Sequence, residues 1–280
     1  MKMKMKKTTL GMMMAVTLFA TSCLSEQQDL APEEKTSSKA TITLNLSAET
    51  QFGEQTRALN EENYRNTFAY TVRLLQDGNV LQTWTGPQST LNKEIEIGQN
   101  NFYTVEAFYG NEHAASRDEF YVYGSSSFEL KGKEQKSVNV RCYPTCGKLS
   151  VKFDESMDTY YDDYSVTYGG TQALGNEHVV WDKDDNEPWY VKLNSAGEKI
   201  TYQINLIAKE EYAHVNADGS KQATGSYIGE ITLLKPNQAH KLTIKPKYMS
   251  DGVGTFTLDI SIDETTNNIE KNWIVPVEWL

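Results

Sequence analysis

The chain has 280 residues and a formal net charge of −11, with 27 basic and 38 acidic side chains. The sequence contains no basic stripe that could follow a phosphate backbone, which argues against nucleic-acid binding. A basic amphipathic helix for binding a membrane surface is equally unsupported.

Residues 1–22 are typical of an export signal. Four lysines lead into the apolar run "LGMMMAVTLFA" at residues 10–20, which is shorter than the roughly 20 residues of a spanning helix. Small residues then precede Cys23, the pattern of a bacterial lipoprotein signal in which the cysteine receives a diacylglycerol. We predict that residues 1–22 are removed and that Cys23 is lipidated. An ordinary cleaved signal and a retained anchor are the alternatives.

Residues 23–39 are polar and acidic and predict a disordered tether. A flexible chain of this length reaches about 20 Å, enough to hold a domain clear of lipid head groups. Glu26 and Asp29 resemble the acidic sorting signal of Bacteroidota-type lipoproteins. The predicted location is therefore the outer membrane, exposed at the cell surface.

From residue 40 the sequence alternates between apolar and polar residues. The first segment, "TITLNL", places Ile42, Leu44 and Leu46 on one face of a strand. The segment 70–84 predicts a hairpin, in which Asp77-Gly78 supplies a type I′ turn. Short strands continue along the chain without a convincing long amphipathic helix. The pattern predicts an all-β protein built of β-sandwiches.

The second half repeats the first at an offset of about a hundred residues. Segments 147–153, 163–170, 200–208 and 239–246 correspond in order to 40–46, 69–76, 101–109 and 135–142. We therefore predict two tandem β-sandwich domains, at 40–143 and 144–280. The tail 254–279 has no counterpart in the first half and predicts an extra C-terminal hairpin with Asn267-Asn268 near its turn.

Each copy also has a short helix candidate after its first strand. In the second copy, four large side chains at helical spacing follow Asp154, which we take as the N-cap. These side chains are Met157, Tyr160, Tyr161 and Tyr164.

The two halves meet at "VRCYPTCGKLSVKF". Few residues separate the predicted strands, so the domains should be coupled. An extended C-x-x-x-C is too long for a disulfide between Cys142 and Cys146, whereas a turn at Pro144 would allow one. Both alternatives remain open.

The signal, the "TRA" segment at 56–58, "SVNVRC" leading into "GKLSVKF", and "YYDDYSVTYGG" at 160–170 resemble a family of two-domain Bacteroidota lipoproteins. That family is catalogued as a domain of unknown function and is fimbrillin-like. The resemblance implies Greek-key or transthyretin-like sandwiches and a surface role in adhesion, fimbria assembly or glycan handling.

The same resemblance implies a role for Arg57 in proteolytic processing. In fimbrillin-like pilins an arginine at this place is cut by an extracellular protease, which removes the lipidated N-terminus together with the first strand. The exposed sheet edge then accepts a strand from another subunit. Arg57 is thus a candidate processing site, with a plain surface arginine as the alternative.

Catalytic motifs are missing from the sequence. His113, His178, His214 and His240 each stand alone, and a G-x-S-x-G elbow, an H-E-x-x-H pair and a P-loop are all absent. The acidic segment 182–188 lacks the Gly and Glu of a calcium loop and predicts a solvated loop. We expect no catalytic residue, no metal site and no cofactor.

Aromatic side chains are the remaining candidates for ligand binding. Trp84, Trp181 and Trp189 lie near predicted strand ends, where a rim for sugar rings could form. Packing in the core is the alternative for all three.

The sequence therefore predicts a non-enzymatic, lipid-anchored surface protein that works in adhesion or as a fimbrial or anchor subunit. Its partners would be the membrane, through Cys23, and other surface or fimbrial subunits through strand exchange. The alternative is a surface glycan-binding lipoprotein that serves polysaccharide uptake.

Overall fold

The computed structural model describes residues 38–52, 59–85, 90–96, 101–249, 255–264, 269–276 and 278–279. The first half of the chain contains β1 (Lys39–Ala48), η1 (Glu61–Arg65), η2 (Thr67–Ala69), β2 (Thr71–Gln76), β3 (Asn79–Thr85), β4 (Thr90–Glu96), β5 (Phe102–Tyr109), β6 (Ala115–Ser116), β7 (Val122–Glu129) and β8 (Gln135–Pro144).

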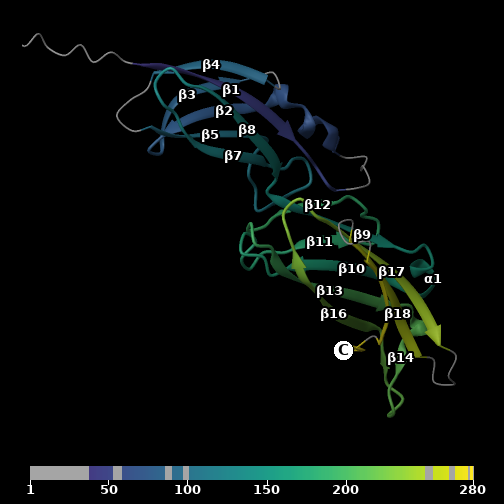
Figure 1. Ribbon diagram of the computed structural model, residues 1–280. Helices are drawn as coiled ribbons and strands as arrows, with labels where there is room; N and C mark the ends of the chain where they lie inside the picture. Colours follow the sequence, from purple (N-terminus) through teal and green to yellow (C-terminus); the bar gives the residue numbers. More distant parts are fainter. Residues whose placement is uncertain are drawn as a thin grey trace, which may run out of the picture. The chain divides into compact units, whose positions relative to one another are not determined.

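The second half contains β9 (Cys146–Phe153), α1 (Met157–Tyr160), β10 (Tyr161–Gly169), β11 (Val179–Asp182), β12 (Trp189–Lys192), β13 (Glu198–Ala208), η3 (Glu210–Tyr212), β14 (His214–Val215), β15 (Lys221–Gln222), β16 (Thr224–Leu234), β17 (Ala239–Met249), β18 (Thr255–Glu264), β19 (Ile269–Pro276) and β20 (Glu278–Trp279). The prediction of an all-β protein is confirmed (Figure 1).

The two halves share one strand order. In the first repeat the order is β3-β2-β5-β7-β8-β1-β4, and β8 joins two layers by pairing with β7 at one end and with β1 along its length. In the second repeat, β11-β10-β13-β16 form one layer and β17-β9-β12 form part of the other. The four matched segments thus occupy equivalent places in the two repeats: β9 and β1, β10 and β2, β13 and β5, and β17 and β8.

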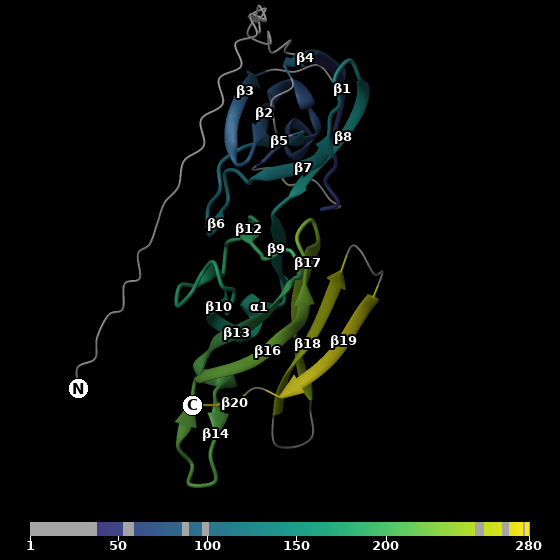
Figure 2. The same cartoon turned by 60° about the vertical axis from the view of Figure 1, so that its left-hand side comes forward.

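The second repeat carries additions at the edges of its sheets. The strands β18 and β19 pair with each other, and β18 pairs with β17, so the C-terminal segment adds a hairpin to the edge of this sheet (Figure 2). The turn at Asn267-Asn268 lies outside the described residues. At the other edge of the same sheet, β6 from the first half pairs with β12.

Alternating side chains build two hydrophobic clusters. On β1, Ile42, Leu44 and Leu46 are buried, as the alternation predicts. The first cluster draws on β1, β2, β5, β7 and β8, and the second draws on β9, β10, β13, β17 and β18. Because each cluster has strands of both layers around it, each repeat is a β-sandwich.

The hairpin turn agrees with its prediction. Asp77 and Gly78 have φ angles of 51° and 78°, and a type I′ turn requires positive φ at both of its central positions. The flanking strands β2 and β3 pair in antiparallel fashion from Gln76 and Asn79 outward.

The predicted helix behind Asp154 is wrong in its extent and its cap. The helix α1 ends at Tyr160, and Tyr161 begins β10, where pairing with Ala208 of β13 supplies the backbone hydrogen bonds. The N-cap is Ser156, whose N–H donates to the Asp154 carboxylate at 3.0 Å. None of the described helices is long and apolar enough to cross a membrane.

Candidate functional site

The strand β1 is the element on which the predicted processing would act. It lies between β8, with which it pairs in parallel from Thr41 to Ala48, and β4, with which it pairs in antiparallel fashion (Figure 1). Cys23 and Arg57, the predicted lipidation and cleavage sites, lie outside the described residues. The structure therefore defines the strand between them, and both sites stay predictions.

The residues that follow β1 are held by contacts with both repeats. The Arg65 guanidinium donates to the Thr50 hydroxyl at 3.0 Å and to the Thr50 carbonyl oxygen at 2.9 Å. The Gln51 N–H donates to the Asn237 side-chain oxygen of the second repeat at 2.8 Å. Phe52 is 2% exposed. The chain that leaves β1 is thus fixed as far as Phe52.

A buried ion pair joins the two repeats. Glu61 opens η1 of the first repeat, and Lys148 lies on β9 of the second. The Lys148 Nζ lies 2.7 Å from the Glu61 Oε1, and these side chains are 4% and 5% exposed. The Tyr190 hydroxyl on β12 donates to the same oxygen at 2.6 Å. Because an unpaired buried charge is costly, each repeat needs the other to bury its charged group.

Tyr190, which bonds this ion pair, belongs to a cluster of aromatic rings. Phe52, Phe120 and Tyr190 contact one another, with ring centroids 4.9 to 5.6 Å apart. Tyr64 stacks on Phe120 at 3.8 Å. Tyr190 comes from the second repeat but packs in the first hydrophobic cluster. The repeats therefore share part of one core, and the contacts couple them, as the short junction predicts.

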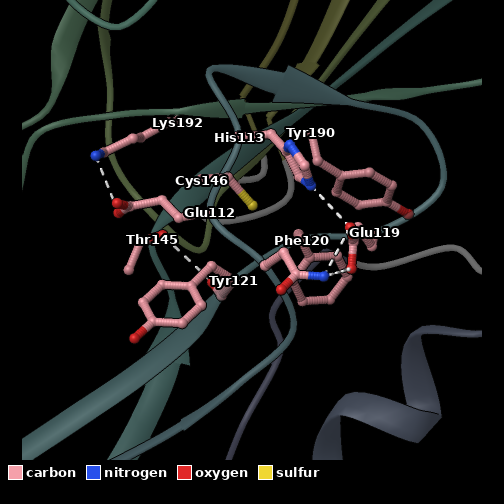
Figure 3. A pocket seen from close by; sticks show the side chains of 10 residues that line it. Glu112, His113, Glu119, Phe120, Tyr121, Thr145, Cys146, Tyr190 and Lys192 are labelled. Atoms are coloured by element: carbon pink, nitrogen blue, oxygen red, sulfur yellow. Dashed lines mark hydrogen bonds and ion pairs between the residues drawn. The ribbon is translucent and has the colours of Figure 1, made fainter.

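A loop between β5 and β7 reaches from the first repeat to the second. Glu112 forms an ion pair with Lys192 at 2.9 Å (Figure 3). Arg117 forms an ion pair with Asp185 of the predicted acidic loop, and its guanidinium lies 4.5 Å from the centroid of the Trp189 ring. Together with the pairing of β6 and β12, these contacts give the loop a structural role.

A small hollow lies beside this loop. His113 and Asn111 hydrogen-bond the Glu119 carboxylate (Figure 3). These bonds lower the pKa of Glu119 below its usual range, and the bond from His113 has the larger effect. The volume open to the centre of a water molecule is about 10 Å³, close to the least that one water needs. The hollow is therefore too small for a sugar or a cofactor.

The two cysteines of the junction are free and buried thiols. They lie at the end of β8 and the start of β9, and β8 extends through Pro144, two residues past the predicted strand end. Burial raises the pKa of Cys142 to about 12 and also raises the pKa of Cys146. Cys142 and Cys146 are therefore not joined by a disulfide in this structure.

The three tryptophans do not form a common surface. Trp181 is 0% exposed, and its indole N–H donates to the Glu187 carbonyl oxygen at 2.7 Å. Trp189 is half-buried against the second hydrophobic cluster and lies next to Arg117. Trp84 is half-buried against the first cluster. The structure thus favours packing roles over a binding rim.

His240 on β17 is the one described histidine in a hydrophobic core. It is 1% exposed, and neither of its ring nitrogens has a hydrogen-bond partner among the described residues. Burial lowers the pKa of His240 to about 3. Among the residues that the structure describes, no group of three His, Cys, Asp or Glu side chains could hold a metal ion.

A family model described as a domain of unknown function (DUF4493) matches residues 38–277. The chain belongs to the DUF4493 family. The prediction of a family of unknown function that spans essentially the whole mature chain is thereby confirmed. A comparison of this DUF4493 chain with curated protein sequences gives no significant match.

Solved structures similar to this DUF4493 chain include two fimbrial proteins. One is a fimbrial assembly protein from Parabacteroides distasonis, at 9% identity and a TM-score of 0.45, over 84% of this chain and 98% of that chain. Another is the fimbrial anchor protein Mfa2 from Porphyromonas gingivalis, at 12% identity and a TM-score of 0.41, over 85% of this chain and 99% of that chain.

Proposed function

We propose that this DUF4493 chain is a non-enzymatic cell-surface protein that works in adhesion as a fimbrial or anchor subunit. A lipid on Cys23 would hold it to the outer membrane, and a cut after Arg57 would prepare it for assembly. The observation that carries the proposal is the place of β1. This strand is bonded on both edges, so its departure would leave an open slot between β4 and β8.

The slot would select its occupant by side-chain pattern. The inner face of β1 buries Ile42, Leu44 and Leu46, each of which contributes about 1.5–3 kcal/mol of hydrophobic stabilisation. An incoming strand must supply three apolar residues at alternate positions to replace them. Until such a strand arrives, β1 stays bound after a cut at Arg57. Its backbone hydrogen bonds to β4 and β8 and its buried side chains do not depend on the peptide bond after Arg57.

Other arginines are less suited to early cleavage. Arg65 is bonded to Thr50, Arg73 lies on β2, and Arg117 pairs with Asp185. Proteases prefer polar segments between ordered elements. Arg57, in the polar segment between Phe52 and η1, is therefore the arginine that we expect to be cut first.

A dilute arginine-specific protease applied to the folded mature protein tests the proposal. By mass spectrometry we expect a first cut after Arg57, and on unheated gels we then expect a ladder of oligomers as strands exchange. The Arg57→Lys variant is the control and should give neither the cut nor the ladder. First cleavage at Arg65, Arg73 or Arg117, or a nicked protein that stays monomeric, would contradict subunit exchange.

The alternative of a glycan-binding lipoprotein receives no support from the three tryptophans. Trp181 is inaccessible, and Trp84 and Trp189 pack against different hydrophobic clusters. A glycan site on this chain must therefore use other aromatic side chains.

A further inference from the structure

A row of aromatic side chains crosses the outer face of the first repeat. Phe108 on β5 pairs with Tyr123 on β7, which in turn pairs with Tyr143 on β8. Their buried sequence neighbours, among them Ala107 and Val122, face the core. Phe108, Tyr123 and Tyr143 therefore point outward. With Tyr121, which precedes β7, they form what we call the aromatic row.

Three rings of this row lie close together. The Tyr121 centroid lies 6.0 Å from that of Phe108 and 6.3 Å from that of Tyr123. The planes of Tyr121 and Tyr123 differ by 22°. Tyr123 is 36% exposed, and Phe108, Tyr121 and Tyr143 are half-buried. The planes of Tyr121 and Phe108 differ by 41°, so the row is a partly exposed aromatic platform whose rings are tilted against one another.

Charged groups of both signs line one edge of the platform. Arg73 on β2 and Glu106 on β5 form an ion pair at 3.5 Å, and the Arg73 guanidinium lies 4.7 Å from the Phe108 centroid. The Tyr123 hydroxyl lies 3.5 Å from the Glu106 carboxylate. The pKa of Tyr121 is raised to about 12, mainly by burial and to a smaller extent by the charges of Glu106 and Glu112. Its hydroxyl is therefore neutral and able to donate.

We propose that the aromatic row binds a neutral saccharide. The apolar C–H faces of sugar rings can pack against the exposed parts of Tyr121 and Tyr123, and the hydroxyls of a sugar both donate and accept hydrogen bonds. Arg73 and Glu106 offer a donor and an acceptor side by side at the rim, with charges that cancel. An anionic ligand is disfavoured by Glu106 and by the net charge of −11 of the chain.

This inference goes beyond the proposed subunit role. The aromatic row lies on β5, β7 and β8 and includes no residue of β1, so saccharide binding needs neither cleavage nor strand exchange. An adhesion protein with such a platform would have a ligand class of its own in addition to its fimbrial partners.

Native affinity gels that contain starch, xylan, galactomannan or the acidic control pectin test the inference with the full mature chain. We expect at least one neutral polysaccharide to slow the wild-type protein. The Tyr123→Ala and Phe108→Ala variants should each bind about threefold to tenfold more weakly, the range that one aromatic contact supports.

Phe102→Ala is the matched control. Phe102 is also on the outer face of β5, at its opposite end, and is 66% exposed, so its loss should leave the retardation unchanged. The proposal is overturned if no neutral polysaccharide slows the protein, or if Phe102→Ala weakens binding as much as Tyr123→Ala does. It is also overturned if Tyr123→Ala alters only the subunit ladder, which would make the row a protein interface.

Discussion

Replacement of Glu61 by Gln removes the negative charge that pairs with Lys148 at the junction of the repeats. The substitution keeps the shape of the side chain, and the Gln oxygen can still accept from the Tyr190 hydroxyl, which lies 2.6 Å from the Glu61 Oε1. The variant therefore tests the charge itself, with the packing of the surrounding rings left in place.

The expected cost follows from the burial of the pair. The side chains of Glu61 and Lys148 are 5% and 4% exposed, so Glu61→Gln leaves a buried ammonium without its counter-charge. Loss of one partner of a buried pair lowers the free energy of unfolding by about 3–5 kcal/mol. For a chain of this size each kcal/mol shifts Tm by about 2–4 °C.

Glu62→Gln is the matched control. It makes the same chemical change one residue along, in a pair with Arg65 that is equally short at 2.7 Å but has side chains 47% and 51% exposed. Exposed pairs contribute about 0–1 kcal/mol. Urea unfolding followed by circular dichroism should separate the two variants clearly. If Glu61→Gln costs no more than Glu62→Gln, the junction does not depend on the buried charge.

Three further outcomes are expected. Burial lowers the pKa of His240 to about 3 in the folded protein, whereas in the unfolded chain this histidine has its ordinary pKa of about 6.5. Below pH 6.5 the unfolded chain therefore binds a proton at His240 that the folded chain does not bind. The free energy of unfolding should thus fall by about 2 kcal/mol more between pH 7 and pH 5 in wild type than in His240→Leu, and equal losses would contradict this. The fragment 147–280 should melt cooperatively and give dispersed amide NMR signals, since the second hydrophobic cluster lies within it, whereas a disordered fragment would show that the halves need a common core. Cys23→Ala should abolish labelling by a fatty-acid analogue and leave unprocessed precursor, and an unlabelled mature protein retained on the membrane would exclude lipidation.

The strands were predictable because their signals are local. The alternation of Ile42, Leu44 and Leu46 sets the inner face of β1, and Asp77-Gly78 sets a turn that few other residue pairs allow. The repeat was predictable because matching strands kept their order at a nearly constant offset. Local signals gave a wrong prediction at Tyr161. Its spacing from Met157 predicts a helix, but Tyr161 lies in β10, which pairs with β13.

The short junction predicts that the repeats are coupled, but the contacts that couple them could not be predicted because they join distant parts of the chain. Lys148 has apolar Leu149 beside it on β9, and alternation places the lysine in solvent. Its burial arises because Glu61 of the other repeat covers it. Tyr190 looks like a core residue of its own repeat but packs in the first cluster. The strand β6 has only two residues, too few for a pattern.

The mature N-terminus of the protein on native cells, read by mass spectrometry together with its mobility on unheated gels, tests the central claim most directly. The proposed subunit role predicts a chain that begins at Ala58 and runs as a ladder of oligomers on unheated gels. A chain that begins at a lipidated Cys23 and runs as a monomer would contradict it.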